Sequence, residues 1–193
     1  MAASWVALAI GVFSLGSAVA ASPSGLSGQA SGPSDQSWSM GFAAGSFNYE
    51  SSGDQGFPIY AVRFDQPTSE WARFEMGVSY VRPEVQTDAV GNFDPALPSK
   101  YSNLVTFTLG LQGRWMLGPL EPYAGIAVGF FGRYDNDFDG RRFSSSTFAF
   151  PVGIRIWATD HIGVRGEFRF NQDGHQVVTR SDSEMTAGLF WTF

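Results

Sequence analysis

Strict alternation between apolar and polar residues is the feature that most constrains what this chain can fold into. From Val105 to Leu117 the residues of one parity are bulky and apolar except for a single glycine, and most of those between them are polar or small. A period of two is the period of a β-strand, because successive side chains point to opposite faces of a sheet. The same pattern recurs in residues 72–80, 148–158 and 162–170. These four segments predict strands with one apolar and one polar face.

Four weaker segments bring the predicted number of strands to eight; they are residues 38–49, 57–64, 123–133 and 183–193. In the first of them the alternation fades after Phe42, and a β-bulge would explain this change. The connections between the eight segments alternate between longer polar loops and short turns, starting with a long loop. This layout is typical of an up-and-down barrel with short turns at one end and longer, outward-facing loops at the other.

The volume of the side chains indicates which face of the barrel points outward. An eight-stranded barrel has an interior just wide enough for side chains. The apolar parity carries Phe, Leu, Ile, Val, Met and Trp on nearly every segment, whereas the polar parity is rich in glycine. The bulky face must therefore point outward, and such an exterior is stable only in lipid. The predicted fold is all-β, an eight-stranded antiparallel up-and-down transmembrane β-barrel.

The N-terminal part of the chain predicts export. Residues 1–20 are mostly apolar and end in Ala18-Val19-Ala20, an A-x-A pattern typical of signal-peptide cleavage. No Lys or Arg precedes this apolar stretch, and an uncleaved membrane helix is the alternative, although the stretch is short for one. Residues 21–37 are rich in Ser, Gly and Pro and predict a flexible leader. The barrel domain is then residues 38–193.

The tryptophans of the predicted barrel all lie where a strand meets the short-turn end; they are Trp38, Trp71, Trp115, Trp157 and Trp191. Tryptophan is enriched at membrane interfaces, where it forms an aromatic girdle. Trp71 and Trp157 fall on the inward parity, so we expect these two to form a floor of the lumen instead.

The chain ends in the sequence GLFWTF, with alternating apolar residues before a terminal aromatic. With the export signal, the alternation and the unequal connections, this ending resembles the small eight-stranded outer-membrane β-barrels of Gram-negative bacteria, such as the OmpX type and the transmembrane domain of OmpA. In that family the terminal aromatic belongs to an assembly signal, which the resemblance places at Leu189, Trp191 and Phe193. The resemblance implies location in the outer membrane, with outer-membrane lipids, lipopolysaccharide and the barrel-assembly machinery as partners.

Composition narrows the chemistry that this chain can perform. The formal charge of −6 argues against a general nucleic-acid binder. The absence of cysteine excludes disulfides and thiolate metal sites, and only two histidines are present. We therefore expect no cofactor, no catalysis and no nucleic-acid partner, and we expect a monomer.

The inward parity carries most of the charged residues of the predicted strands. Arginine outnumbers glutamate among them, so we expect a bound anion or turn carboxylates such as Asp65 and Asp160 to balance the charge. Paired charges would lock a narrow lumen as a structural plug, and an ion path is the alternative. The predicted lumen residues are Arg63, Arg73, Glu75, Arg114, Arg155, Arg165, Glu167, Arg169 and Glu184.

The stretch DNDFDG, residues 135–140, matches the start of a calcium-binding loop, with Asp135, Asp137 and Asp139 as candidate metal ligands. The twelfth position of such a loop should be a bidentate Glu, but here it is Ser146. A solvated acidic loop is the competing interpretation.

His175, Ser183 and Glu184 raise a second possibility, because lipid A deacylases as a family carry a His, a Ser and an acid late in a barrel. Their compact H-x-S pattern is absent, and ordinary loop residues are the simpler interpretation. We therefore predict a barrel with a charged, plugged interior that acts in envelope structure or binds an extracellular ligand through its loops. A narrow ion or solute pore and a lipid-modifying outer-membrane enzyme are the alternatives.

Overall fold

The computed structural model describes residues 37–48, 56–85, 96–98, 100–135, 142–174 and 179–193. The predicted signal peptide lies outside this part of the chain, and so does the predicted leader apart from Ser37. The first strand begins at Ser39, next to the predicted start of the barrel domain. Within the described residues, no helix is long and apolar enough to cross a membrane.

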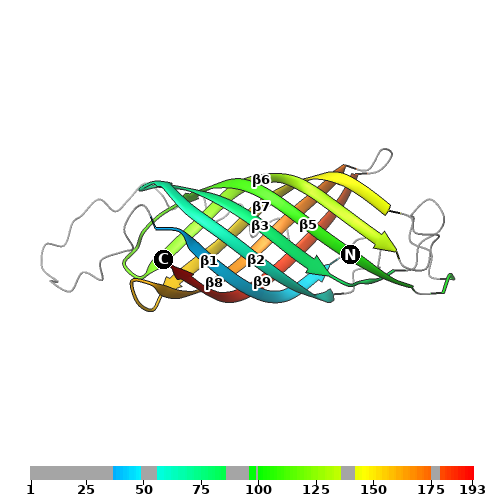
Figure 1. Ribbon diagram of the computed structural model, residues 1–193, viewed down its shortest axis with the longest axis horizontal. Helices are drawn as coiled ribbons and strands as arrows, with labels where there is room; N and C mark the ends of the chain where they lie inside the picture. Colours follow the sequence, from blue (N-terminus) through cyan, green and yellow to red (C-terminus); the bar gives the residue numbers. More distant parts are fainter. Residues whose placement is uncertain (1–36, 49–55, 86–95, 99, 136–141, 175–178) are drawn as a thin grey trace, which may run out of the picture.

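Eight long strands, each antiparallel to its neighbours, close into a barrel and cross its long axis obliquely (Figure 1). They are β1 (Ser39–Asn48), β2 (Gly56–Ser69), β3 (Ala72–Val81), β5 (Lys100–Arg114), β6 (Leu120–Asp135), β7 (Arg142–Trp157), β8 (Ile162–Gly174) and β9 (Thr179–Thr192). A short extra strand, β4 (Glu84–Val85), pairs with β5, while β5 also pairs with β3 within the barrel. The predicted all-β, eight-stranded up-and-down barrel is confirmed.

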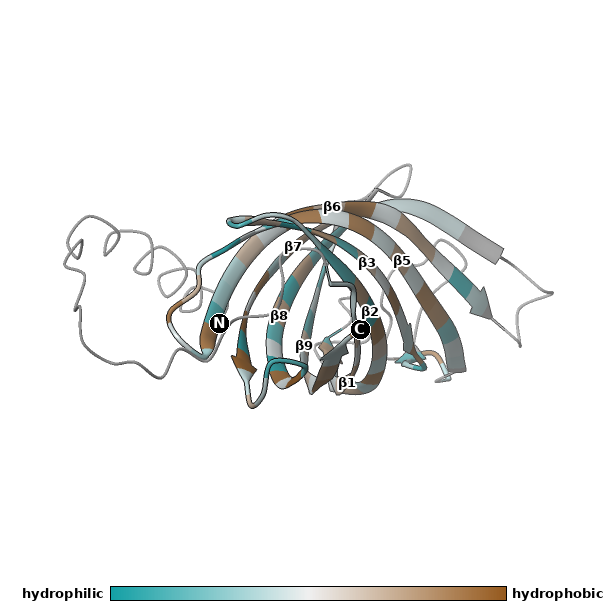
Figure 2. Cartoon of the chain, turned by 60° about the vertical axis from the view of Figure 1, so that its left-hand side comes forward, coloured by the Kyte–Doolittle hydropathy of each residue, from teal (hydrophilic) through white to brown (hydrophobic). Residues whose placement is uncertain are grey.

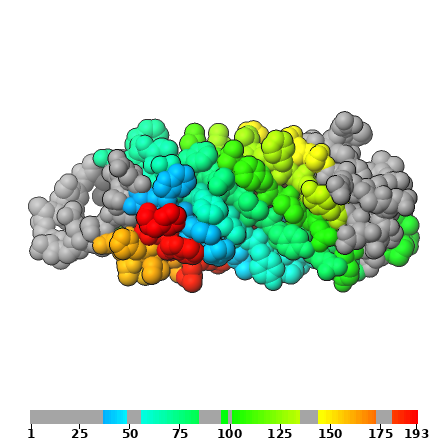
Figure 3. Space-filling view, in the orientation of Figure 1, coloured from blue at the N-terminus to red at the C-terminus, as the bar shows by residue number. Residues whose placement is uncertain are grey.

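The last strand closes the barrel against the first. β9 pairs with β1 from Ser39 opposite Thr192 to Asn48 opposite Ser183. Figure 3 shows the red C-terminal residues packed beside the blue residues of β1. Beyond the strands, the Phe193 amide donates a hydrogen bond to the Trp38 carbonyl oxygen at 3.0 Å. The barrel therefore has no open sheet edge along this seam.

The barrel strands carry apolar side chains outward and polar ones inward over most of their length. On β3, for example, Val78 and Tyr80 are exposed on the outside, while Arg73 and Glu75 are buried inside. The alternation is visible as brown and teal segments along the ribbons of Figure 2. A charged interior inside an apolar exterior is stable where the exterior meets lipid, so this is a transmembrane barrel.

Inward-facing glycines allow the strands to coil tightly around a narrow lumen. A Cβ atom at Gly45 would lie 1.8 Å from the Met185 carbonyl oxygen, and one at Gly129 would lie 1.8 Å from the Phe107 carbonyl oxygen. No side chain fits at such a separation from the neighbouring backbone. These two positions therefore require glycine because adjacent strands approach each other closely.

The strands extend further than the hydrophobic alternation predicts. β8 continues to Gly174 and β9 begins at Thr179, so most of the predicted loop between them is strand. At the turn end, β6 already begins at Leu120, within a predicted turn. Between β8 and β9 the period-two signal fades because outward residues such as Ser181 are no longer apolar, although the backbone ladder continues.

The bulge suggested for the first strand is not present. β1 pairs residue by residue with both β2 and β9. The alternation fades because the outward residues Ser46 and Asn48 are polar, whereas the inward residue Phe47 is apolar and buried. A register shift is present instead at the other end of β2, between Pro67 and Ser69, where this strand pairs with β3 beside the short turn.

Candidate functional site: the barrel lumen

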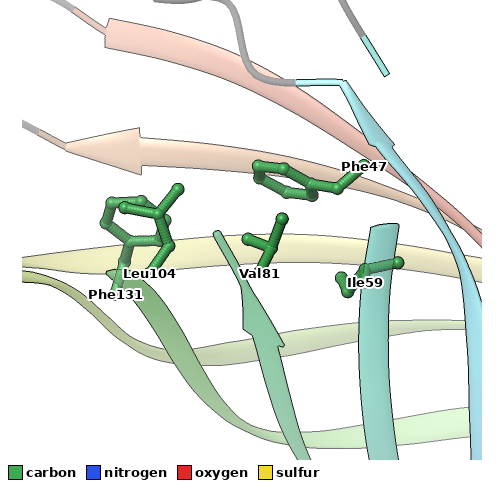
Figure 4. Packing of buried hydrophobic residues seen from close by; sticks show 5 residues of the cluster. All are labelled: Phe47, Ile59, Val81, Leu104 and Phe131. Carbon is green, nitrogen blue, oxygen red and sulfur yellow. The ribbon is translucent and has the colours of Figure 1, made fainter. Parts of the chain in front are cut away.

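The end of the lumen nearest the long connections is filled by an apolar group, which we call the apolar cap. It consists of Phe47, Ile59, Val81, Leu104 and Phe131, one residue from each of β1, β2, β3, β5 and β6. Figure 4 shows these five side chains gathered near the ends of their strands. Their exposed fractions range from 0% to 8%. The cap was not predicted, because apolar residues on the inward parity obscure the alternation by which that parity is recognised.

Six charged side chains meet in the middle of the lumen and form what we call the central cluster. They are Arg63, Glu75, Arg165, Glu167, Arg169 and Glu184. Arg169 contacts Glu75 on β3, and its Nε lies 3.1 Å from Glu184 Oε1 on β9. Arg165 contacts both Glu75 and Glu167. With three guanidinium groups and three carboxylates, the central cluster carries no net charge.

Uncharged side chains complete the hydrogen bonding of the central cluster. The Gln112 side-chain amide donates to Glu75 Oε2 at 2.7 Å. The Tyr123 hydroxyl donates to Glu167 Oε2 at 2.9 Å and accepts a hydrogen bond from Arg165 Nε at 2.7 Å. Buried carboxylates with several donors are held in one geometry, so this cluster ties strands from all around the barrel together.

A second group of charges, the basal cluster, lies closer to the short turns; its members are Asp65, Arg73, Glu121 and Arg155. Arg155 bridges the two carboxylates, with Nη2 at 2.6 Å from Asp65 Oδ1 and Nη1 at 3.2 Å from Glu121 Oε1. Arg73 Nη2 lies 2.9 Å from Glu121 Oε1, and the Ser39 hydroxyl donates to Asp65 Oδ2 at 3.1 Å. The basal cluster is also neutral, and Arg165 links it to the central cluster by a 3.5 Å contact with Asp65.

The turn end of the lumen is closed by an aromatic pair. Trp157 and Phe190 meet edge to face, with ring centroids 4.6 Å apart. The Trp157 indole N–H also donates to Glu121 Oε2 at 3.0 Å, which joins the pair to the basal cluster. Trp157 therefore forms the predicted floor, but Trp71 does not, because its side chain lies in the β2–β3 turn and is 71% exposed.

All nine charged residues predicted to face inward are buried in the lumen. Eight of them belong to the two clusters, and Arg114 donates from Nη2 to the Ser69 carbonyl oxygen at 3.0 Å. Glu121 and Tyr123 were missed, because the sequence around them was assigned to a turn or a weak strand. Both residues have the same parity as the small residues Gly125 and Ala127, and this shared parity was the available sign that they face inward.

The predicted excess of arginine is offset by carboxylates from this chain. The buried, described residues include seven arginines and six carboxylates. The additional acidic groups are those of Asp65, which the prediction named as a turn residue, and of Glu121 and Asp182, which it did not include. Asp160, the other predicted partner, is exposed in the β7–β8 turn and belongs to neither cluster. A bound anion is therefore not needed for near neutrality.

The C-terminal residues divide between the two faces of β9. Leu189, Trp191 and Phe193 point outward, with exposed fractions of 61%, 37% and 70%, while Phe190 points into the lumen. The break in alternation at Phe190 is thus explained by its place in the floor. The outward Trp191 packs on Phe42 of β1, with ring centroids 5.6 Å apart.

Two sequence hypotheses fall largely on residues that the structure does not describe. Of the candidate calcium ligands, Asp137 and Asp139 lie outside the described residues, and Asp135 is the last residue of β6. Among the described residues there is no group of His, Cys, Asp and Glu side chains able to hold a metal ion. For the lipid-modifying hypothesis, His175 is likewise outside the described residues. Ser183 and Glu184 are consecutive in β9, so their side chains project to opposite faces of the strand, and that of Glu184 enters the central cluster.

The sequence matches no protein-family model and no curated protein. The fold, however, is similar to solved outer-membrane barrels. Neisserial surface protein A gives a TM-score of 0.61 at 15% identity, covering 83% of this chain and 98% of that chain. OprG from Pseudomonas aeruginosa gives 0.56 at 13% identity, covering 84% and 98%. The attachment invasion locus protein Ail of Yersinia pestis, in complex with the heparin analogue sucrose octasulfate, gives 0.53 at 11% identity, covering 82% and 97%.

At these identities the likeness concerns the fold alone. The chain has the fold of the small eight-stranded outer-membrane β-barrels, as the resemblance in its sequence predicted. A closed antiparallel barrel with an apolar, lipid-facing exterior is the transmembrane architecture of outer membranes.

Proposed function

We propose that this protein is a non-conducting, non-enzymatic outer-membrane barrel that acts in envelope structure or by presenting its loop end to an extracellular ligand. The observation that carries the proposal is the continuous filling of the lumen. The apolar cap, the central cluster, the basal cluster and the aromatic floor follow one another along the barrel axis.

Burial of the charged side chains argues against a water-filled path. The side chains that line an open channel are in contact with water, yet Arg73, Arg155 and Arg169 are at most 1% exposed. Both clusters are neutral, so they also provide no fixed charge that would attract ions of one sign. These features support the plug and not the pore.

Planar-bilayer recordings test this part of the proposal. The purified barrel should give no single-channel steps. The double variant Arg165→Ala/Glu167→Ala removes both partners of a central pair but leaves the apolar cap and the aromatic floor in place, so it should give no steps either. Steps of the same size in both proteins would show that a path already exists beside the clusters, and the pore alternative would then be correct.

The lipid-modifying alternative requires a separate test. Lipid A from cells that overproduce the protein should have the same mass spectrum as lipid A from cells with an empty vector. Cells that overproduce Ser183→Ala serve as the matched control. A new lipid A species that depends on Ser183 would overturn the non-enzymatic proposal.

In this proposal Leu189, Trp191 and Phe193 act as the signal for the barrel-assembly machinery. Their outward position supports the assignment, because these side chains stay accessible until lipid covers them. Deletion of Phe193 should sharply lower the amount of heat-modifiable barrel in the outer membrane. Phe190→Leu, which alters only the inward face, should lower it much less. Equal levels for both variants would argue against the assignment.

A further inference from the structure

The outward face of the β5–β6 hairpin is apolar up to its tip. Leu117 and Leu120 pair across the hairpin through an isolated bridge and are 63% and 38% exposed. They follow Trp115, which is exposed on the same face of the hairpin. The lipid-facing surface of β5 and β6, which includes Leu111 and Ile126 and which we call the lipid-facing belt, therefore continues past Trp115 to the tip of the hairpin.

The hairpin is a well-defined structure. The Leu117 amide donates to the Leu120 carbonyl oxygen at 2.8 Å, and the reverse bond measures 3.3 Å. Between them Gly118 adopts a φ of 65°, a left-handed conformation that favours glycine, and Pro119 follows it. The tip therefore presents its leucines in a fixed direction.

The other two short turns are different. The β7–β8 turn exposes Thr159, Asp160 and His161, as a turn in water normally does. The outward residues before the β2–β3 turn, Gln66 and Thr68, are polar as well. In the β5–β6 hairpin, by contrast, every residue from Trp115 to Leu120 is apolar or glycine.

A second exposed aromatic lies beside the hairpin. The Arg114 amide donates to the Trp71 carbonyl oxygen at 2.9 Å, so the β2–β3 turn is held against the end of β5. Five apolar side chains at this place are each more than a third exposed, and we call them the apolar turn patch; they are Trp71, Trp115, Met116, Leu117 and Leu120. Contiguous exposed apolar side chains of this kind mark a contact surface.

We propose that the apolar turn patch is inserted into the membrane leaflet at the turn end of the barrel, with Leu117 and Leu120 among the lipid chains. The argument is continuity, because the patch extends the lipid-facing belt of β5 and β6 with no polar side chain between them. At the next hairpin around the barrel, the polar β7–β8 turn remains in water. The protein is thereby anchored more deeply on its β5–β6 side.

A depth measurement tests this proposal, and the chain suits it because it contains no cysteine. Three single-cysteine variants carry the same environment-sensitive fluorophore, nitrobenzoxadiazole: Leu117→Cys at the hairpin tip, Thr159→Cys in the polar turn and Val128→Cys on the lipid-facing side of β6. The barrels are placed in phosphatidylcholine nanodiscs, which leave both barrel ends open to the buffer. Quenching is measured with iodide in the buffer and with spin-labelled lipid in the disc.

The label at residue 117 should behave like the label at residue 128. We expect blue-shifted emission, strong quenching by the spin-labelled lipid, and iodide quenching several-fold weaker than at residue 159. Equal iodide quenching at 117 and 159 would overturn the proposal. Protection from iodide without lipid quenching would also overturn it, because a second copy of the chain would then cover the patch.

Discussion

The apolar cap and the two charged clusters fill the same narrow lumen by different physical means. In the cap, side chains such as Leu104 and Phe131 exclude water by packing, and each contact is non-directional. In the clusters, buried guanidinium and carboxylate groups need specific partners at hydrogen-bond distance. The clusters therefore determine which strands are tied together, whereas the cap tolerates exchange of one apolar side chain for another of similar volume.

The largest expected loss of stability comes from removing one carboxylate of the central cluster. Glu167→Ala leaves Arg165 and Arg169 short of a partner, and uncompensated buried charge costs about 3–5 kcal/mol. Urea unfolding in phosphatidylcholine vesicles, followed by tryptophan fluorescence, measures the change in the free energy of unfolding. Glu70→Ala, in the exposed β2–β3 turn, is the control and should match the unaltered protein. A Glu167→Ala loss no larger than that of the control would mean that water already solvates the cluster.

A cavity in the apolar cap should cost somewhat less. Leu104→Ala deletes a fully buried side chain, and such changes typically cost about 2–4 kcal/mol. Leu104→Met keeps the volume and should cost less than about 1.5 kcal/mol. The same urea titration compares both with Leu109→Ala on the lipid-facing side, where lipid can fill the space. If Leu104→Ala and Leu109→Ala have equal effects, the cap is not closely packed.

The junction between the floor and the basal cluster should show an intermediate effect. Trp157→Phe keeps an aromatic ring against Phe190 but removes the indole donor to Glu121. Loss of a hydrogen bond to a buried carboxylate should lower the free energy of unfolding by about 1.5–3 kcal/mol. Trp71→Phe, at an exposed position, should leave the urea midpoint unchanged. An unchanged midpoint for Trp157→Phe as well would show that another donor replaces the indole.

The smallest effect is expected from salt. Mobile ions screen exposed charge pairs, but they screen buried pairs much less. Raising the sodium chloride concentration should therefore leave the urea midpoint of the unaltered barrel nearly constant. A clear decrease would indicate that ions reach the clusters, and it would weaken the contrast between the charged clusters and the apolar cap.

Sequence reasoning succeeded where a residue's surroundings depend only on which face of a strand it occupies. Arg155 and Glu167 were assigned to the lumen by parity, and both are buried there. It failed where an apolar residue faces inward or where the outward face turns polar. The fading alternation after Phe42 suggests a bulge, and the segment with Glu121 reads as a turn, because a hydrophobic period is visible only when the two faces differ in the same sense along the strand.

Residue volume and a period of two are enough to predict that the chain forms strands, that their bulky face points to lipid, and that charge lies inside. Which charges meet, in contrast, is established by the closed barrel. Arg63 and Glu184 are 121 positions apart in sequence, yet Arg63 Nη2 lies 2.6 Å from Glu184 Oε1. Such pairing depends on how the strands are staggered when the barrel closes, and alternation carries no information on that stagger.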